Sequence, residues 1–186
     1  PDKVLKEYGS EILRLWVAMS DYQSDLKISD NILKQNGELY RKIRNTARFL
    51  LANVSDLEEI VSVDKMGPLD KWVLNKAKKV FDEIEAAFNV YEFSKGLNKL
   101  NNFLVVDLSG IYLDVCKDRL YCDDKNDIHR LASQSAMALI AKKLISTIAP
   151  ILTYTMDELL SFAPNFIKGD CEDIFDYEKV VLPNVE

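Results

Sequence analysis

The feature that most constrains the fold is a spacing of three, four or seven residues between apolar side chains. Because an α-helix has about 3.6 residues per turn, side chains with this spacing lie on one face of a helix. That face must be buried against other elements of the molecule. The first such stripe consists of Ile32, Leu39, Ile43, Ala47, Leu50 and Val54.

Three further stripes follow, and residues that begin or end helices stand beside them. Ser29 or Asp30 is the expected N-cap of the first helix, and Pro68 is expected near N1 of the second. Pro150 closes the fourth helix because proline cannot continue the hydrogen-bond ladder. The later stripes are Leu69, Val73, Ala77, Val80, Ile84 and Phe88; Phe93, Leu97, Leu100, Leu104, Leu108, Ile111 and Val115; and Ile128, Leu131, Ser135, Leu139, Lys142 or Leu144, Ile145 and Ile148.

Shorter segments flank these helices. A helix from about Asp2 to Ala18 is expected to be interrupted near Gly9. A last short helix is predicted to begin at Thr155, because Thr155 and Glu158 have the spacing of a capping box, and residues 165–186 are predicted to be loop. Four long amphipathic segments with short connections predict an all-α fold, a helical bundle of four long helices plus short flanking helices.

The sequence lacks the signals of several function classes. The apolar run at residues 104–106 ends at Asp107, which is far too short for a membrane span, and no signal peptide is visible. A cytoplasmic protein is therefore expected. The three cysteines have no paired spacing and His129 is alone, so neither a disulfide nor a metal site is predicted. No catalytic motif occurs in the sequence, and no catalytic residue is assigned.

For nucleic-acid binding, the distribution of charge along the chain matters more than the net charge. The formal net charge is −6, which by itself argues against nucleic acid. Charges more than about 8–10 Å apart are screened at physiological salt, so binding depends on local clusters. Residues 41–48 hold four basic side chains and no acidic one.

This basic segment is the best candidate for a binding face. On a helix, Arg41, Arg44, Asn45 and Arg48 fall roughly opposite the apolar stripe, whereas Lys42 lies to one side. Arginine donates to phosphates in a planar fork and stacks on bases, and asparagine can both donate and accept. The alternative from the residues alone is an ordinary solvated helix face.

Lys117 and Arg119 form a weaker candidate. They lie near the expected C-terminus of the third helix, where cations favour the helix dipole. Pairing with Asp114 or Asp118 explains them equally well.

Several stretches together resemble the isoleucine-tRNA ligase family. The most specific is Arg41-Lys42-Ile43-Arg44-Asn45-Thr46-Ala47-Arg48-Phe49-Leu50-Leu51. The related valine and leucine enzymes carry different residues there. The others are residues 8–18 with Asp21, Tyr22 and Asp25; Ser29-Asp30-Asn31-Ile32-Leu33; Leu69-Asp70-Lys71-Trp72; Tyr112-Leu113-Asp114 with Lys117-Asp118-Arg119-Leu120-Tyr121; and Ala149-Pro150-Ile151-Leu152.

The resemblance implies a helical anticodon-binding domain cut from a larger enzyme that joins isoleucine to its tRNA with ATP. Residues 1–30 are then a junction that follows the catalytic core, residues 31–163 the anticodon-binding bundle, and residues 164–186 a tail leading to a missing C-terminal segment. The His-Ile-Gly-His and Lys-Met-Ser-Lys-Ser signatures of the family do not occur here. The fragment is therefore expected to bind without catalysing, with ATP and zinc left to the parent enzyme.

The resemblance also implies partners and site residues. The partners are the anticodon stem-loop of an isoleucine tRNA and the catalytic domain of the same chain, and no oligomer is expected. The binding residues are Arg41, Arg44, Asn45 and Arg48, followed by Lys42, Lys117 and Arg119. The rival hypothesis is a helical scaffold or protein-interaction domain that does not bind RNA.

Overall fold

The computed structural model describes residues 2–23, 25–26 and 28–185. All regular secondary structure within these residues is helical, so the predicted all-α class is confirmed. The elements are α1 (Asp2–Tyr8), α2 (Ser10–Met19), α3 (Asp30–Asn53), η1 (Val63–Lys65), α4 (Pro68–Asn89), α5 (Phe93–Asn102), η2 (Phe103–Leu113), α6 (Asp114–Cys122), α7 (Ile128–Ile148), α8 (Thr153–Ser161), α9 (Asn165–Lys168) and η3 (Ile174–Asp176).

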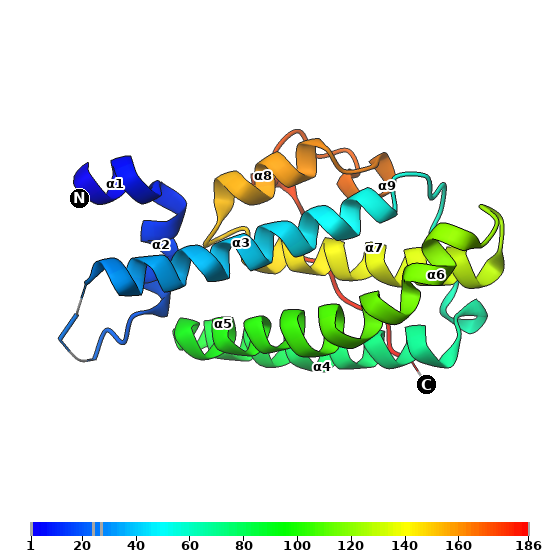
Figure 1. Cartoon of the computed structure of the whole chain (residues 1–186), viewed down its shortest axis with the longest axis horizontal. Coiled ribbons are helices and arrows are strands. Elements are labelled where there is room, and N and C mark those ends of the chain that lie inside the picture. Colours follow the sequence, from blue (N-terminus) through cyan, green and yellow to red (C-terminus); the bar gives the residue numbers. More distant parts are fainter. Residues whose placement is uncertain (1, 24, 27, 186) are drawn as a thin grey trace.

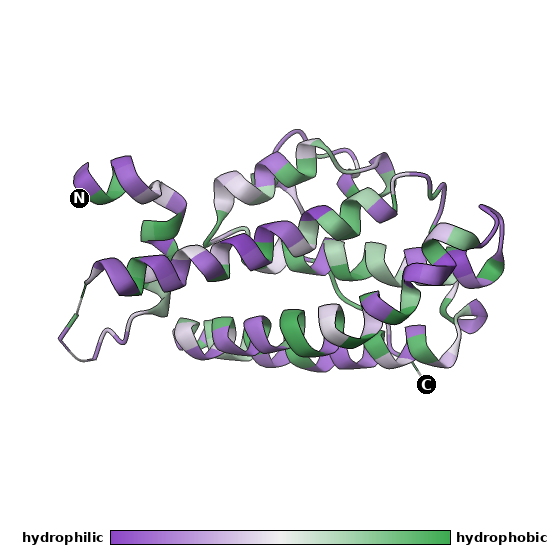
Figure 2. Ribbon diagram, viewed as in Figure 1, coloured by the Kyte–Doolittle hydropathy of each residue, from purple (hydrophilic) through white to green (hydrophobic). Residues whose placement is uncertain are grey.

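Four long helical stretches make up the bundle in the described residues: α3, α4, α7, and the run formed by α5, η2 and α6. In Figure 1, α3 and α7 run through the middle, α4 and α5 lie below them, and α8 lies above. Hydrophobic and hydrophilic bands alternate along α3, α4 and α5 (Figure 2), as expected of helices that bury one face.

The predicted helix starts and stops are largely confirmed. The Ser29 hydroxyl accepts a hydrogen bond from the Ile32 backbone N–H at 3.3 Å, so Ser29 is the N-cap of α3. Pro68 opens α4. Gly9 separates α1 from α2 with a φ of 85°, a left-handed conformation that favours glycine. α7 ends at Ile148, before Pro150.

Helix α7 buries most of its surface rather than one narrow stripe. It packs against α3, α4, α6 and α8, and every residue from 132 to 138 is buried. The alanine and serine residues in this stretch let neighbouring helices approach closely. The predicted stripe is therefore partly wrong. Ile128 is exposed and Leu131, Leu139 and Lys142 are only half-buried, all on one outward face of the helix, whereas Leu144, Ile145 and Ile148 are buried.

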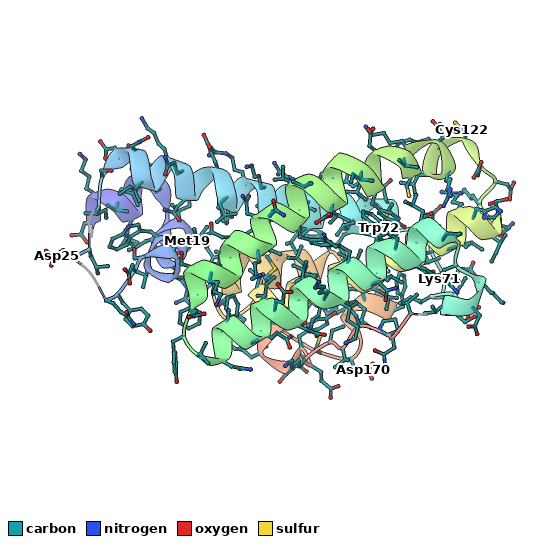
Figure 3. The ribbon with its side chains drawn as sticks, turned by 90° about the horizontal axis from the view of Figure 1, so that it is seen from below. Met19, Asp25, Lys71, Trp72, Cys122 and Asp170 are labelled. Carbon is teal, nitrogen blue, oxygen red and sulfur yellow. The ribbon has the colours of Figure 1, made fainter. Side chains whose placement is uncertain are left out.

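The third predicted stripe is wrong beyond Leu108. Ile111 and Val115 are exposed, whereas Tyr112 and Cys116 lie in the core. The reason is η2, where the chain forms wider π-helical turns between α5 and α6. These turns contain more residues than an α-helical turn and shift the buried face by one residue. Figure 3 shows this helical run beside α4, with Cys122 at its far end.

The capping box predicted at Thr155 is also wrong. Helix α8 begins at Thr153, so Thr155 lies inside its first turn. The Thr155 backbone N–H donates instead to the Glu11 carboxylate of α2 at 3.1 Å, and the Thr155 hydroxyl lies 3.0 Å from that of Tyr40. A side chain distant in sequence therefore satisfies a backbone donor of the α8 N-terminus.

The C-terminal residues pack onto the bundle although most of them are irregular. Ile174, Leu182 and Val185 are buried. Lys143 of α7, whose side chain is only 3% exposed, pairs with Glu85 of α4 and donates to the Val180 carbonyl at 2.7 Å. This ammonium group therefore joins α7, α4 and the C-terminal segment.

A buried carboxylate joins four helical elements. Asp70 of α4 is fully buried and accepts hydrogen bonds from the Tyr112 hydroxyl at 2.6 Å and the Ser133 hydroxyl at 2.9 Å. Arg119 of α6 lies 3.5 Å from the other Asp70 oxygen and 3.2 Å from the Ser133 hydroxyl. Burial and the Asp70 charge raise the pKa of Tyr112 well above its usual value, so Tyr112 remains a donor.

We predict that Tyr112→Phe destabilises the fold, because it removes one donor to a buried carboxylate and keeps the ring in place. The expected loss is about 1–3 kcal/mol in the free energy of unfolding, measured with urea. Tyr121→Phe is the matched control, since Tyr121 is exposed and its loss should change little. Equal stability of the two variants would contradict the role assigned to the Tyr112 hydroxyl.

We predict that Glu85→Gln leaves the Lys143 ammonium without a full counter-charge and lowers the free energy of unfolding by about 2 kcal/mol at pH 7. This is less than the cost for a fully buried pair, because the Glu85 side chain keeps 21% exposure. Glu83→Gln, two residues away, is the control, because Glu83 pairs with Lys99 in a more exposed setting.

The pH dependence follows from the pKa of Glu85. Burial raises this pKa, but hydrogen bonds from Lys143 and Lys179 outweigh burial, so the net shift is downward. A carboxylate with a lowered pKa stabilises the fold above its unfolded pKa of about 4.3, and this contribution disappears as the pH falls through the folded value. The difference between Glu85→Gln and the parent protein should therefore be full at pH 7 and shrink below about pH 4.

Candidate nucleic-acid interface

The basic face of α3 points away from the core, as the sequence predicts. Ile43, Ala47 and Leu50 are fully buried on the inner side of the helix. Arg41, Asn45 and Arg48 are exposed on the outer side. Among the described residues, Arg41 and Arg48 have no ion-pair partner. Two guanidinium groups and an amide are therefore held on a rigid helix and left available for a ligand.

Arg44 differs from its neighbours. Its guanidinium lies 3.0 Å from the Glu158 carboxylate of α8, and its side chain keeps only 29% exposure. This ion pair joins α3 to α8 above the core. It fixes the position of Arg44 and offsets much of its charge, so Arg44 is less available to a phosphate than Arg41 or Arg48.

The remaining predicted site residues lie elsewhere. Lys42 is exposed on α3. Lys117 is on α6, where its pairing with Asp114 at 2.7 Å raises its pKa. Arg119 contacts the buried Asp70 and Ser133. In the described chain, no hydrogen bond or ion pair joins Lys117 or Arg119 to the face of α3. The structure therefore places Arg119 in the framework of the bundle.

A hollow lies beside the basic face, between α3 and α8, with a volume of about 430 Å³. None of the residues predicted from the sequence lies on its α8 side, where Phe162, the residue after α8, is 78% exposed. The sequence contains one indication of this residue, because Phe162 stands at the end of the last predicted helix, two residues before Pro164. The hollow is lined by Arg44, Arg48, Leu51, Ala52, Ser55, Glu158, Leu159 and Phe162.

Within the described ranges, no group of three or more His, Cys, Asp or Glu side chains is placed to hold a metal ion. The three thiols are separate, with Cys116 in the core and Cys122 on the surface. No helix in the described part of the chain combines the length and apolar character needed to cross a membrane.

A comparison with families of known proteins agrees with the helical fold. Residues 70–182 match the family described as the anticodon-binding domain of tRNA ligase. The match begins within α4, so the basic face of α3 lies outside it.

Curated relatives match the chain from end to end. An isoleucine-tRNA ligase of Aliarcobacter butzleri is 90% identical over 186 residues, which is all of this chain and 20% of the relative. One from a Nitratiruptor species is 63% identical over the same 186 residues, again 20% of the relative. One from Campylobacter fetus is 62% identical over 184 residues, which is 98% of this chain and 20% of the relative.

The chain thus spans about a fifth of the length of these relatives. The family match covers more than half of the chain and includes α5 to α9, and the helical bundle described above agrees with it. The chain belongs to the family of anticodon-binding domains of tRNA ligases.

Proposed function

We propose that this chain is the part of an isoleucine-tRNA ligase that binds the anticodon arm of the isoleucine tRNA. The observation that carries the proposal is the outer face of α3, where Arg41, Asn45 and Arg48 are exposed and Arg41 and Arg48 lack an ion-pair partner among the described residues. The identity to isoleucine-tRNA ligases over the whole chain supports the choice of tRNA.

The chemistry of recognition follows from these side chains. Arg41 and Arg48 donate to phosphate oxygens and fix the position of the RNA, which carries no sequence information by itself. Asn45 lies between them and can both donate to and accept from the edge of an unpaired base. Lys42 adds positive charge on α3 itself. Lys117 would contact the RNA separately, from α6, where it pairs with Asp114, and Arg119 acts through the framework rather than by contact.

The rest of such a ligase supplies what this chain lacks. In this proposal, ATP, isoleucine and zinc are bound by other parts of the ligase. Residues 1–30 connect the bundle to the catalytic domain, and residues 31–163 form the binding bundle. Residues 164–186 lead to a C-terminal segment of the ligase. Binding of the anticodon arm then favours placement of the acceptor end in the distant active site, which is a coupling between two sites. The ligase is proposed to act as a cytoplasmic monomer.

We predict that Arg41→Glu combined with Arg48→Glu weakens binding of an isoleucine tRNA transcript by at least about tenfold at low salt. The slope of log affinity against log salt should fall by about one for each phosphate that the variant no longer binds. The measurement is a binding isotherm at two salt concentrations, with circular dichroism to confirm that the variant folds.

The control is Lys79→Glu combined with Lys95→Glu, which changes the net charge equally on α4 and α5, across the bundle from α8 (Figure 1). This control should bind like the parent protein. If both double variants bind normally, the chain is a scaffold that does not bind RNA through either face. If only the α4–α5 variant loses binding, the RNA lies on the other side of the bundle and the assignment to α3 is wrong.

A further inference from the structure

The hollow between α3 and α8 has two walls of different chemistry. Arg48 contributes a guanidinium from α3, and Phe162 contributes a ring that is 78% exposed, just after the last residue of α8. The Phe162 backbone N–H donates to the Leu159 carbonyl at 3.3 Å, so the ring projects from an ordered helix end. Leu51, Ala52 and Leu159 also line the hollow. The lining therefore combines apolar side chains and an aromatic ring with a cation, and the Arg44–Glu158 ion pair also lies in it.

An exposed phenylalanine next to arginine matches the way proteins bind unpaired bases. Bases of RNA loops stack on aromatic rings and on guanidinium planes, and this stacking depends little on which base is present. A folded protein rarely gains stability from a phenylalanine left in water, because burial of apolar surface is what stabilises folds. The ring is thus available to cover a flat apolar ligand.

The charge in the hollow indicates which part of the RNA enters it. Glu158 lies in the lining beside Arg44, at 3.0 Å. Its carboxylate repels a phosphate, but it accepts hydrogen bonds from the amino groups of bases, as acidic side chains do at base edges. Arg48, which lines the hollow and is exposed, has no such acidic partner in the described chain and is available to the adjoining phosphate. The ligand that fits is a nucleobase with its phosphate outside.

We propose that Phe162 stacks on one unpaired base of the anticodon loop in this hollow, while Arg48 binds the phosphate next to that base. This inference rests on the proposed function and adds the residue that follows α8 to the face of α3. Phe162 is then a base-contacting residue whose contribution is independent of charge.

The test compares Phe162→Ala with Phe162→Trp for binding to an isoleucine tRNA transcript. Phe162→Ala should weaken binding by about 5- to 100-fold, the range expected for loss of one stacked base. The slope of affinity against salt should stay unchanged, because no charge is removed. Phe162→Trp should restore binding. Phe175→Ala is the matched control, because Phe175 is 83% exposed, lies in η3 and does not line the hollow.

A second measurement identifies the base. Anticodon stem-loop RNAs, each with one abasic position in the loop, are bound to the parent protein and to Phe162→Ala. At the stacked position the two proteins should bind equally, since the base that the ring contacts is absent. If Phe162→Ala weakens binding by the same factor for every abasic RNA, the proposal that Phe162 stacks on one defined base is wrong.

The outcomes separate this inference from the proposed function. If Phe162→Ala binds like Phe175→Ala while the Arg41 and Arg48 double variant loses binding, the stacking proposal is wrong and the function of α3 stands. If neither set of variants alters binding, both proposals are wrong.

Discussion

The buried Asp70 carboxylate is the constraint on which the arrangement of helices depends. A charge without water is costly unless donors surround it. Here the donors come from three other elements, with Tyr112 on η2, Arg119 on α6 and Ser133 on α7. Moving any of these elements along its neighbours would leave Asp70 without one of its donors. The hydrophobic core alone tolerates small shifts far better, because apolar contact has no direction.

This requirement is compatible with the unusual turns of η2. In a regular α-helix continued from α5, the stripe that contains Leu104 and Leu108 would turn Ile111 and Val115 inward. The π-helical turns bring Tyr112 and Cys116 inward instead, and place the Tyr112 hydroxyl 2.6 Å from Asp70. Gly96 of α5 allows the close approach of the same helical run to α4, since a Cβ there would lie 2.6 Å from the Phe88 ring. This close approach lies in the last turn of α4, whereas Asp70 lies in its first turn, so the π-helical turns alone concern the Asp70 junction.

The sequence predicts what depends on local rules. The start of α3 at Ser29, the start of α4 at Pro68 and the stop before Pro150 follow from caps and from proline geometry, which involve only neighbouring residues. The sequence could not predict η2, because Ile111 and Val115 continue the α-helical spacing and nothing local favours Tyr112 and Cys116 in their place. The capping box expected at Thr155 fails for a similar reason, since the donor is satisfied by Glu11, more than a hundred residues earlier. Such partners depend on the tertiary fold.

The same distinction applies to the candidate interface. The outward face of α3 is predictable, because Arg41, Asn45 and Arg48 lie opposite an apolar stripe. The pairing of Arg44 with Glu158 and the position of Phe162 are not predictable, because they depend on how α8 lies over α3. The net charge of −6 is no obstacle to RNA, since acidic side chains beyond about one Debye length are screened. Because α3 is fixed by its buried side, its backbone needs no further ordering when a ligand arrives, and the ordering cost is limited to the exposed side chains of Arg41 and Arg48.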